Sequence, residues 1–399
     1  MNNISIYTLT SELHDVQAVS KATQEFLDSL HINYDFHDDD YSDYGSAPLS
    51  LIYVRTGGTE GIFRRLLSQL QQKSQAPFYL LTSGKSNSLA ASLEILSFLR
   101  KKDISGEVIH GSTSHITKRI QLLAHSQQAI RQLQGARVGV IGKPSDWLIS
   151  STADYVAVKR RLGIDIIDIP MQELLDTIQQ TPQEDPQLTS NEEHIRQALP
   201  MAHQIYLALR TLAEKHQLQG LTIRCFDLLT SVHNTGCLAL ARLNSEGVVA
   251  GCEGDIPTLL TMMMAKAVTG VSGFQANPAH INPETGEMLF AHCTIPFNMV
   301  ERYEFDTHFE SGIGVGIRGY MQPGPVTVFK VAGDLSRHFA AEGELLRCEG
   351  KPDLCRTQQV IQLNHPEQAR YFLTEPIGNH HVIIPGHVAE VMEEILKVI

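Results

Sequence analysis

The chain is poor in cysteine, and its cysteines form no metal-binding or redox motif. All six lie in the second half of the sequence: Cys225, Cys237, Cys252, Cys293, Cys348 and Cys355. No two of them are separated by only two residues, which argues against zinc ribbons and thioredoxin-like CxxC sites. We therefore expect reduced thiols that serve as small core residues.

Long apolar runs and an excess of positive charge are also missing. No window approaches the roughly 18–20 consecutive apolar residues of a membrane-spanning helix. The first residues, MNNISIYTLTSELHD, show no basic region followed by an apolar stretch. The net charge of −12 would repel nucleic acids and anionic lipids. These features predict a cytoplasmic protein that binds neither nucleic acid nor membranes.

Strands and helices are predicted to alternate along the first third of the chain. With 399 residues, the chain is too long for one ordinary hydrophobic core. In residues 1–137, short apolar runs such as ISIYTL and LSLIYVRT alternate with segments of helical spacing. Because few tight hairpin signals occur there, this pattern predicts an N-terminal α/β domain with a parallel sheet covered by helices.

The alternation resumes and then gives way to another pattern. Residues 138–290 contain VGVIG, IDIIDIP and GVVAGCEGD as strands between helices, which predicts a central α/β domain. Residues 291–399 consist mainly of short strand-like pieces separated by glycine and proline, which predicts a C-terminal β-rich domain. The expected fold class is therefore α/β, with two parallel-sheet sandwich units followed by a mostly antiparallel β domain.

Glycine-rich segments do not identify a nucleotide site. TGGTEG at 56–61 and TSGKSNS at 82–88 follow predicted strands but lack the Walker A spacing, so turns that start helices are favoured over anion cradles. GIGVGIRG at 312–319 contains a GxGxxG pattern. A turn and a strand follow it rather than a helix, so dinucleotide binding is rejected there.

Two carboxylates stand where an apolar strand turns into a helix. In VVAGCEGDIPTLL, Glu253 and Asp255 fall at the carboxyl end of the strand, and as i,i+2 residues of an extended segment they would point the same way. Asp255 precedes Pro257 and is a natural N-cap. Glu253 has no such role, and a carboxylate beside an apolar strand requires a partner. We interpret Asp255 as a cap and Glu253 as a site residue.

Three histidines provide possible partners for Glu253. His292 lies inside the apolar strand MLFAHCTIP, and His380 and His381 open another strand in GNHHVIIPGH. Because neighbouring strand residues face opposite sides, only one of His380 and His381 can look into a given site. A carboxylate with imidazoles from separate strands suits a divalent ion such as Mn²⁺.

Trp147 is the only tryptophan of the chain. It follows a predicted strand in IGKPSDWLIS. A lone aromatic residue beside a strand end could stack on a sugar, and it could equally pack in the core.

At these positions the chain resembles the L-fucose isomerase and L-arabinose isomerase superfamily. CEGD before an apolar helix resembles the family's acidic strand end, LFAHC resembles a segment with a ligand histidine, and GNHH resembles a motif whose second histidine is the ligand. The resemblance implies Mn²⁺, or another divalent cation, bound by Glu253, His292 and His381. It also implies a homo-oligomer, a trimer or hexamer, with active sites between subunits.

One ligand of the family is missing. The family carries a second acidic ligand after the helix that follows the first, and GFQANPAHIN stands there instead, with Asn277 as the closest match. A neutral amide can ligate through its oxygen but cannot act as a proton-transferring base. The resemblance thus implies two catalytic residues, with Glu253 as ligand and possible base and Asn277 as weak ligand or substrate contact.

Three functions follow from these observations. The leading hypothesis is a metal-dependent aldose–ketose isomerase that acts on a sugar or sugar derivative through an enediol. The replacement at Asn277 favours, as an alternative, a diverged member that binds carbohydrate or runs a different carbonyl reaction without isomerisation. The third is a structural oligomer in which Glu253 forms a buried ion pair with Arg224 or another base.

Overall fold

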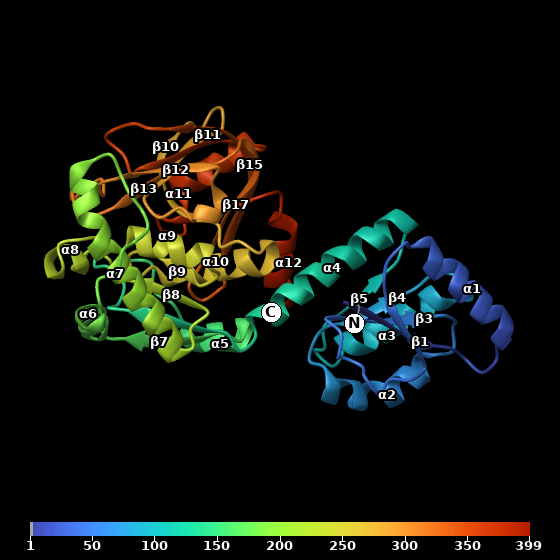
Figure 1. The fold of residues 1–399 in the computed structure, drawn as a ribbon. Helices are drawn as coiled ribbons and strands as arrows, with labels where there is room; N and C mark the ends of the chain where they lie inside the picture. Colours follow the sequence, from blue (N-terminus) through green and yellow to red (C-terminus); the bar gives the residue numbers. More distant parts are fainter. Residues whose placement is uncertain (1–2) are drawn as a thin grey trace. The chain divides into compact units, whose positions relative to one another are not determined.

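The protein divides into two compact units, whose elements are labelled in Figure 1. In this computed structural model, which describes residues 3–399, unit 1 extends to Arg131 and also includes Glu394–Val398. Unit 2 comprises Gln132–Glu393 and Ile399. Each unit has its own sheets and hydrophobic core.

Unit 1 is built on a five-stranded parallel sheet with the order β2-β1-β3-β4-β5. Its strands are β1 (Ile4–Leu9), β2 (Asp35–Asp38), β3 (Leu49–Val54), β4 (Phe78–Leu81) and β5 (Gly106–Ile109). The helices between and after them are α1 (Val16–Ser29), α2 (Glu60–Lys73), α3 (Ser88–Arg100) and α4 (Thr113–Leu133). Neighbouring strand residues Leu51 and Ile52 are both fully buried, because helices cover the sheet. The predicted N-terminal parallel sheet is confirmed.

The glycine-rich loops of unit 1 lead directly into helices. The loop at 56–61 runs into α2, and the loop at 82–88 runs into α3. The two loops also bond each other, since Gly57 N donates to the carbonyl oxygen of Ser86 at 2.7 Å. These contacts agree with the interpretation of both segments as turns that start helices.

Unit 2 begins with a four-stranded parallel sheet of order β7-β6-β8-β9. Its strands are β6 (Arg137–Ile141), β7 (Asp165–Ile169), β8 (Gly220–Ile223) and β9 (Val249–Gly251). Its helices are α5 (Tyr155–Leu162), α6 (Met171–Gln180), α7 (Glu193–His216), α8 (Asp227–Ser231), α9 (Cys237–Ser245) and α10 (Ile256–Thr269). The second predicted parallel sheet is therefore also present.

The C-terminal part of unit 2 forms a closed antiparallel barrel. In order around the barrel, its strands are β10 (Phe274–Ile281), β11 (Glu287–His292), β16 (Thr357–Leu363), β15 (His338–Glu349), β14 (Gly324–Val331) and β17 (His381–Pro385). The remaining elements of unit 2 are β12 (Arg302–Asp306), β13 (Gly316–Tyr320), η1 (Phe297–Met299), η2 (Pro366–Arg370) and α11 (Tyr371–Thr374). Helix α12 (Ala389–Val398) begins in unit 2, and its residues from Glu394 belong to unit 1. Alternate residues such as Val326 and Val328 fill the barrel core. The predicted antiparallel β character of this region is confirmed.

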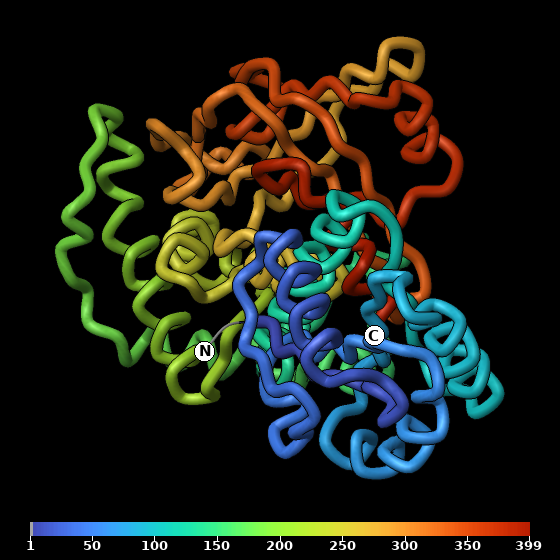
Figure 2. Tube along the Cα trace, turned by 90° about the vertical axis from the view of Figure 1, so that its right-hand side faces the viewer, coloured from blue at the N-terminus to red at the C-terminus, as the bar shows by residue number. Residues whose placement is uncertain are grey.

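Helix α10 links the second parallel sheet to the barrel. It follows β9 and lies against β14 and β17. Figure 1 labels α10 and β17 next to each other, and Figure 2 traces the same chain after a turn of 90°. One joining contact is the bond from Val331 N to Thr261 Oγ1, at 3.2 Å. Strand β10 and most of β11 precede residue 291, where we predicted that the third domain begins, and the three-domain division stays a prediction.

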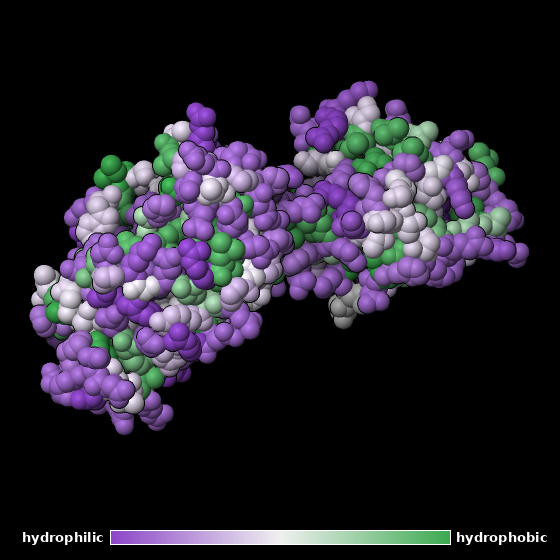
Figure 3. All heavy atoms as spheres, turned by 90° about the horizontal axis from the view of Figure 1, so that it is seen from above, coloured by the Kyte–Doolittle hydropathy of each residue, from purple (hydrophilic) through white to green (hydrophobic). Residues whose placement is uncertain are grey.

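Among residues 3–399, no helix combines the length and apolar character needed to cross a bilayer. Figure 3 shows a face on which hydrophilic residues predominate and hydrophobic residues gather in small groups.

All six cysteines are free thiols. Cys225, Cys237, Cys252 and Cys293 are buried, and the other two are half-buried. The Sγ atoms of Cys225 and Cys252 lie 3.1 Å apart. The expectation of unpaired core cysteines therefore agrees with the structure for the four buried ones.

Candidate metal centre

Glu253 stands in a sharp turn between β9 and α10. Its φ is +63° and that of Gly254 is +71°, so both residues lie in the left-handed region. Position 254 requires glycine, because a Cβ there would lie 2.4 Å from the carbonyl oxygen of Lys143. The expectation that Glu253 and Asp255 share one side of an extended segment is wrong, since this turn separates them. A non-glycine residue held in this conformation is typical of functional sites.

Asp255 is the N-cap of α10, as predicted. Its carboxylate accepts a hydrogen bond from Thr258 N at 2.8 Å, and a proline occupies the first helical turn. The same carboxylate is fully buried and lies 3.4 Å from Lys330 Nζ. Asp255 therefore does more than start a helix, because it is also the counter-charge of a buried lysine.

Glu253, His292 and His380 each bring one ligand atom within 4.8 Å of the other two. Glu253 Oε1 lies 3.7 Å from His292 Nε2 and 3.5 Å from His380 Nε2. The three side chains come from the turn after β9, the end of β11 and the residue before β17, and all are buried. This carboxylate–imidazole group could hold a metal ion.

The second nitrogen of each imidazole is held from the other side. His380 Nδ1 donates to Asp255 Oδ2 at 2.9 Å, and His292 Nδ1 lies 3.1 Å from Thr294 Oγ1. The buried His380 Nε2, which points toward Glu253, has no hydrogen-bond partner. A carboxylate behind a histidine is the usual outer contact of a metal-bound imidazole. The donor set and the unpartnered nitrogen therefore fit a divalent cation.

Burial and the neighbouring charges shift the pKa values of this group in opposite directions. Burial alone would raise the pKa of Glu253, but His292 and His380 hold it well below its usual range. Burial would likewise raise the pKa of Asp255, and Lys330 and His380 lower it. For His380, burial favours the neutral ring, yet its contacts with the two carboxylates raise its pKa to about 9. A metal ion on Nε2 would thus replace a proton at neutral pH.

Trp147 borders the group on its outer side. Its indole Nε1 donates to Glu253 Oε2 at 2.6 Å, although the residue is 49% exposed. The preceding residue, Asp146, receives two bonds from Arg224, at 3.0 and 2.6 Å. Arg224, a possible partner of Glu253 in the structural alternative, is therefore bound to Asp146 instead.

His381 does not join the group. It is paired with Ala276 between β17 and β10, its Nε2 lies 3.1 Å from the Tyr371 hydroxyl, and its ring packs against Phe372 at 4.7 Å. Because neighbouring side chains face opposite ways, this placement turns His380 toward the candidate site. The structure thus brings His380 to Glu253 instead of the predicted His381.

Asn277 lies beside the group, one residue along the chain from Ala276, which pairs with His381. It belongs to β10, and its Oδ1 accepts a hydrogen bond from Asn379 Nδ2 at 3.1 Å. Asn379 directly precedes His380, so this hydrogen bond places Asn277 at the border of the site. Within the described part of the chain, the group contains a single carboxylate, that of Glu253.

Two contacts of the group were hard to predict from the sequence. Trp147 meets Glu253 across 106 residues, and the only hint was a lone tryptophan after a strand. The carboxylate of Asp255 lies behind His380 across 125 residues, and the only hint was its spacing from Glu253.

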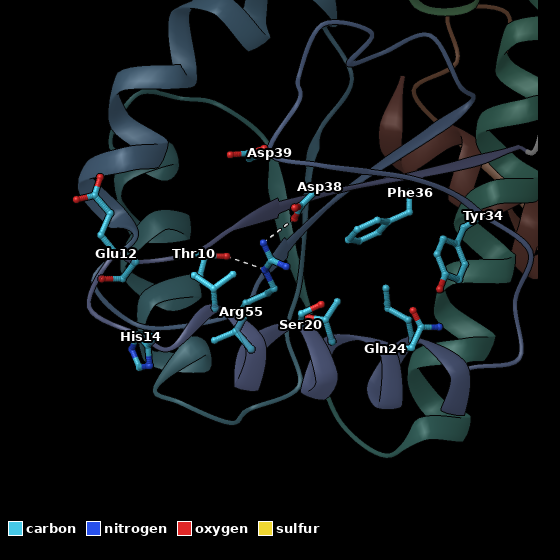
Figure 4. Close-up of a pocket in the computed structure, with 15 residues that line it drawn as sticks. Thr10, Glu12, His14, Ser20, Gln24, Tyr34, Phe36, Asp38, Asp39 and Arg55 are labelled. Carbon is cyan, nitrogen blue, oxygen red and sulfur yellow. Dashed lines mark hydrogen bonds and ion pairs between the residues drawn. The ribbon is translucent and has the colours of Figure 1, made fainter.

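Unit 1 contains a separate concave region, shown in Figure 4. This cavity has a volume of about 540 Å³ and lies between α1 and β2. Arg55 donates to Thr10 Oγ1 and to Asp38 Oδ1, both at 2.6 Å, and Tyr34 and Phe36 contribute an apolar wall. The cavity shares no residue with the candidate metal centre, which lies wholly in unit 2.

No protein-family model matches the chain. It is similar, however, to curated proteins named sulfoquinovose isomerase. It is 21% identical over 230 residues to the one from Alkalicoccus urumqiensis, covering 54% of this chain and 52% of that protein. It is 20% identical over 292 residues to those from Priestia aryabhattai and Priestia megaterium, covering 67% of this chain and 64% of each. The chain thus spans between 52% and 64% of the length of these relatives, whose names are those of sugar isomerases.

Proposed function

We propose that this protein is a metal-dependent isomerase that interconverts aldose and ketose forms of a sugar or sugar derivative. The observation that carries the proposal is the buried His380 Nε2, which has no hydrogen-bond partner and points toward Glu253. His292 and His380 converge on the same oxygen of Glu253 at 3.7 and 3.5 Å. These separations exceed ordinary hydrogen-bond lengths and suit donors that share one cation.

The proposed ligands are Glu253 Oε1, His292 Nε2 and His380 Nε2, with Mn²⁺ as the expected metal. When bound, the ion would act as a Lewis acid on the carbonyl and neighbouring hydroxyl oxygens of the sugar. Asp255 holds His380 by its Nδ1, so that Nε2 stays directed at the site. Glu253 would take the proton from the carbon next to the carbonyl and return it to the former carbonyl carbon through an enediol, and Asn277 would contact the substrate.

The similarity to proteins named sulfoquinovose isomerase supports a sugar substrate. A sulfonated hexose is accordingly the first compound to test, followed by common aldoses. The motifs that resemble the fucose and arabinose isomerase superfamily support membership of that superfamily and a homo-oligomer, a trimer or hexamer. The composition supports a cytoplasmic location.

A second candidate is a carbohydrate-binding protein that does not isomerise its ligand. It is favoured by Asn277, which stands where the resemblance places a second carboxylate and which is bonded to Asn379 instead of to the group. A site with one carboxylate has lost a possible base. Under this alternative, metal and sugar still bind, but no ketose forms.

Metal content tests the proposal. The protein would be stripped with a chelator, incubated with Mn²⁺, freed of excess ion and analysed for metal, with Glu253→Gln as the test variant. Glu246→Gln is the matched control, because it removes a half-exposed carboxylate elsewhere in unit 2. We expect one ion per chain in the wild type and in the control, and loss of the ion in Glu253→Gln.

The metal-loaded protein is then incubated with sulfoquinovose and a set of aldoses, and products are followed by NMR. Formation of a ketose supports the isomerase. Stoichiometric metal with sugar binding but without turnover favours the second candidate. A wild type that holds no divalent ion contradicts the proposed metal centre.

A further inference from the structure

The two oxygens of Glu253 have different neighbours. Oε1 faces the imidazoles of His292 and His380, whereas Oε2 accepts the indole N–H of Trp147 at 2.6 Å. We propose that Trp147 is a positioning residue that makes Glu253 a one-oxygen metal ligand, and that its exposed ring is the wall against which the sugar lies. This inference rests on the proposed function and assigns a role that the three ligands alone do not contain.

The indole bond determines what Glu253 can do. With Oε2 engaged by a donor, only Oε1 is directed at the histidines, so the carboxylate would bind an ion through one oxygen. The arrangement thus directs Oε1 alone at the proposed ion.

The loop that carries Trp147 is fixed to the turn that carries Glu253. Ser145 N donates to the backbone oxygen of Glu253 at 2.9 Å. Arg224 donates to the backbone oxygen of Pro144 at 2.8 Å and to both carboxylate oxygens of Asp146. The indole is therefore held in place before any ion binds, which is what an outer contact of a metal ligand requires.

The ring of Trp147 offers a surface next to the candidate metal centre. Its edge-on contact with Phe226, at 4.7 Å between centroids, still leaves the residue 49% exposed. An indole combines a broad apolar ring with one polar N–H, which here is already used by Glu253. The exposed part of the ring can therefore contact an apolar surface, such as the C–H groups along one side of a sugar.

Two variants separate the two roles. Trp147→Phe keeps an aromatic ring and removes the N–H, so the affinity for Mn²⁺ should fall by about tenfold. Trp147→Leu removes the ring as well, and at saturating Mn²⁺ it should raise the sugar KM about fivefold above that of Trp147→Phe with little change in kcat. Tyr155→Phe is the control, because it removes a hydroxyl bond to Asp168 on β7, at the opposite edge of the sheet from β9.

The fluorescence of Trp147 also gives a measure of metal binding that requires no assay of turnover. Since the chain has one tryptophan, its emission should change saturably as Mn²⁺ is added, with one midpoint for emission and metal content. Wild-type protein that binds Mn²⁺ with no change in emission, or Trp147→Phe that binds it as tightly as wild type, would overturn this inference and leave the proposed function intact. Absence of metal from the wild type would overturn the proposed function itself.

Discussion

His380 and Asp255 are joined by a hydrogen bond of 2.9 Å between Nδ1 and Oδ2, although 125 residues separate them in the chain. The same carboxylate accepts the Thr258 N–H at the start of α10 and lies beside Lys330. One buried group therefore fixes the start of a helix, the position of a buried lysine and the orientation of a candidate metal ligand.

The substitution Asp255→Asn tests this orienting role. Asparagine is a good N-cap, so the helix start should be preserved. Loss of the charge behind His380 should weaken Mn²⁺ binding about 10- to 100-fold, measured by competition with a chelating dye. Asp154→Asn, which changes the N-cap of α5, is the control and should leave the affinity unchanged. Equal Mn²⁺ affinity in Asp255→Asn and wild type would contradict the role.

Substitution of His380 and of its neighbour His381 should have different effects. His380→Ala removes a donor from the group and should abolish stoichiometric Mn²⁺ binding, measured as metal content. His381→Ala should retain the ion and instead reduce the free energy of unfolding by about 1–3 kcal/mol, because its ring packs with Phe372 and bonds Tyr371. Loss of the metal in His381→Ala but not in His380→Ala would reverse the assignment.

Lys330→Met tests the buried ion pair with Asp255. The lysine side chain is 1% exposed and that of the aspartate 0%, so removal of the cation leaves a buried carboxylate with less compensation. We expect a loss of about 3 kcal/mol in the free energy of unfolding, measured with urea. The double variant Lys330→Met/Asp255→Asn should recover part of this loss. A single variant as stable as wild type would show that the pair is unimportant for stability.

Asn277→Asp tests the missing ligand. The new carboxylate can still accept the hydrogen bond of Asn379, so the strand should be undisturbed. If position 277 reaches the ion, the added negative charge should tighten Mn²⁺ binding about tenfold. Asn282→Asp, just after the end of β10, controls for a general effect of charge. An identical affinity in Asn277→Asp and wild type would place this residue outside the metal site.

Much of the fold followed from local patterns. The apolar runs of β1 and β3 and the helical spacing between them predicted a parallel sheet, because strand–helix alternation is visible within short windows. The N-cap role of Asp255 was likewise local, since it depends on the residue type and on the following proline.

The choice between His380 and His381 was not local. It depends on where β17 begins and on its pairing with β10, in which His381 stands opposite Ala276. Alternation showed that only one histidine could face the site, but not which one. The turn at Glu253 also escaped prediction, because its left-handed backbone depends on the close approach of Lys143 to Gly254.

Strand β17 closes the barrel by pairing with both β10 and β14, and His380 stands directly before it. On the ribosome, Glu253 and His292 are therefore made well before the third member of their group. At ordinary rates of protein synthesis the interval from residue 253 to residue 380 lasts roughly ten seconds. During that interval a divalent ion meets only an incomplete set of donors, so metal capture should coincide with closure of the barrel and not precede it.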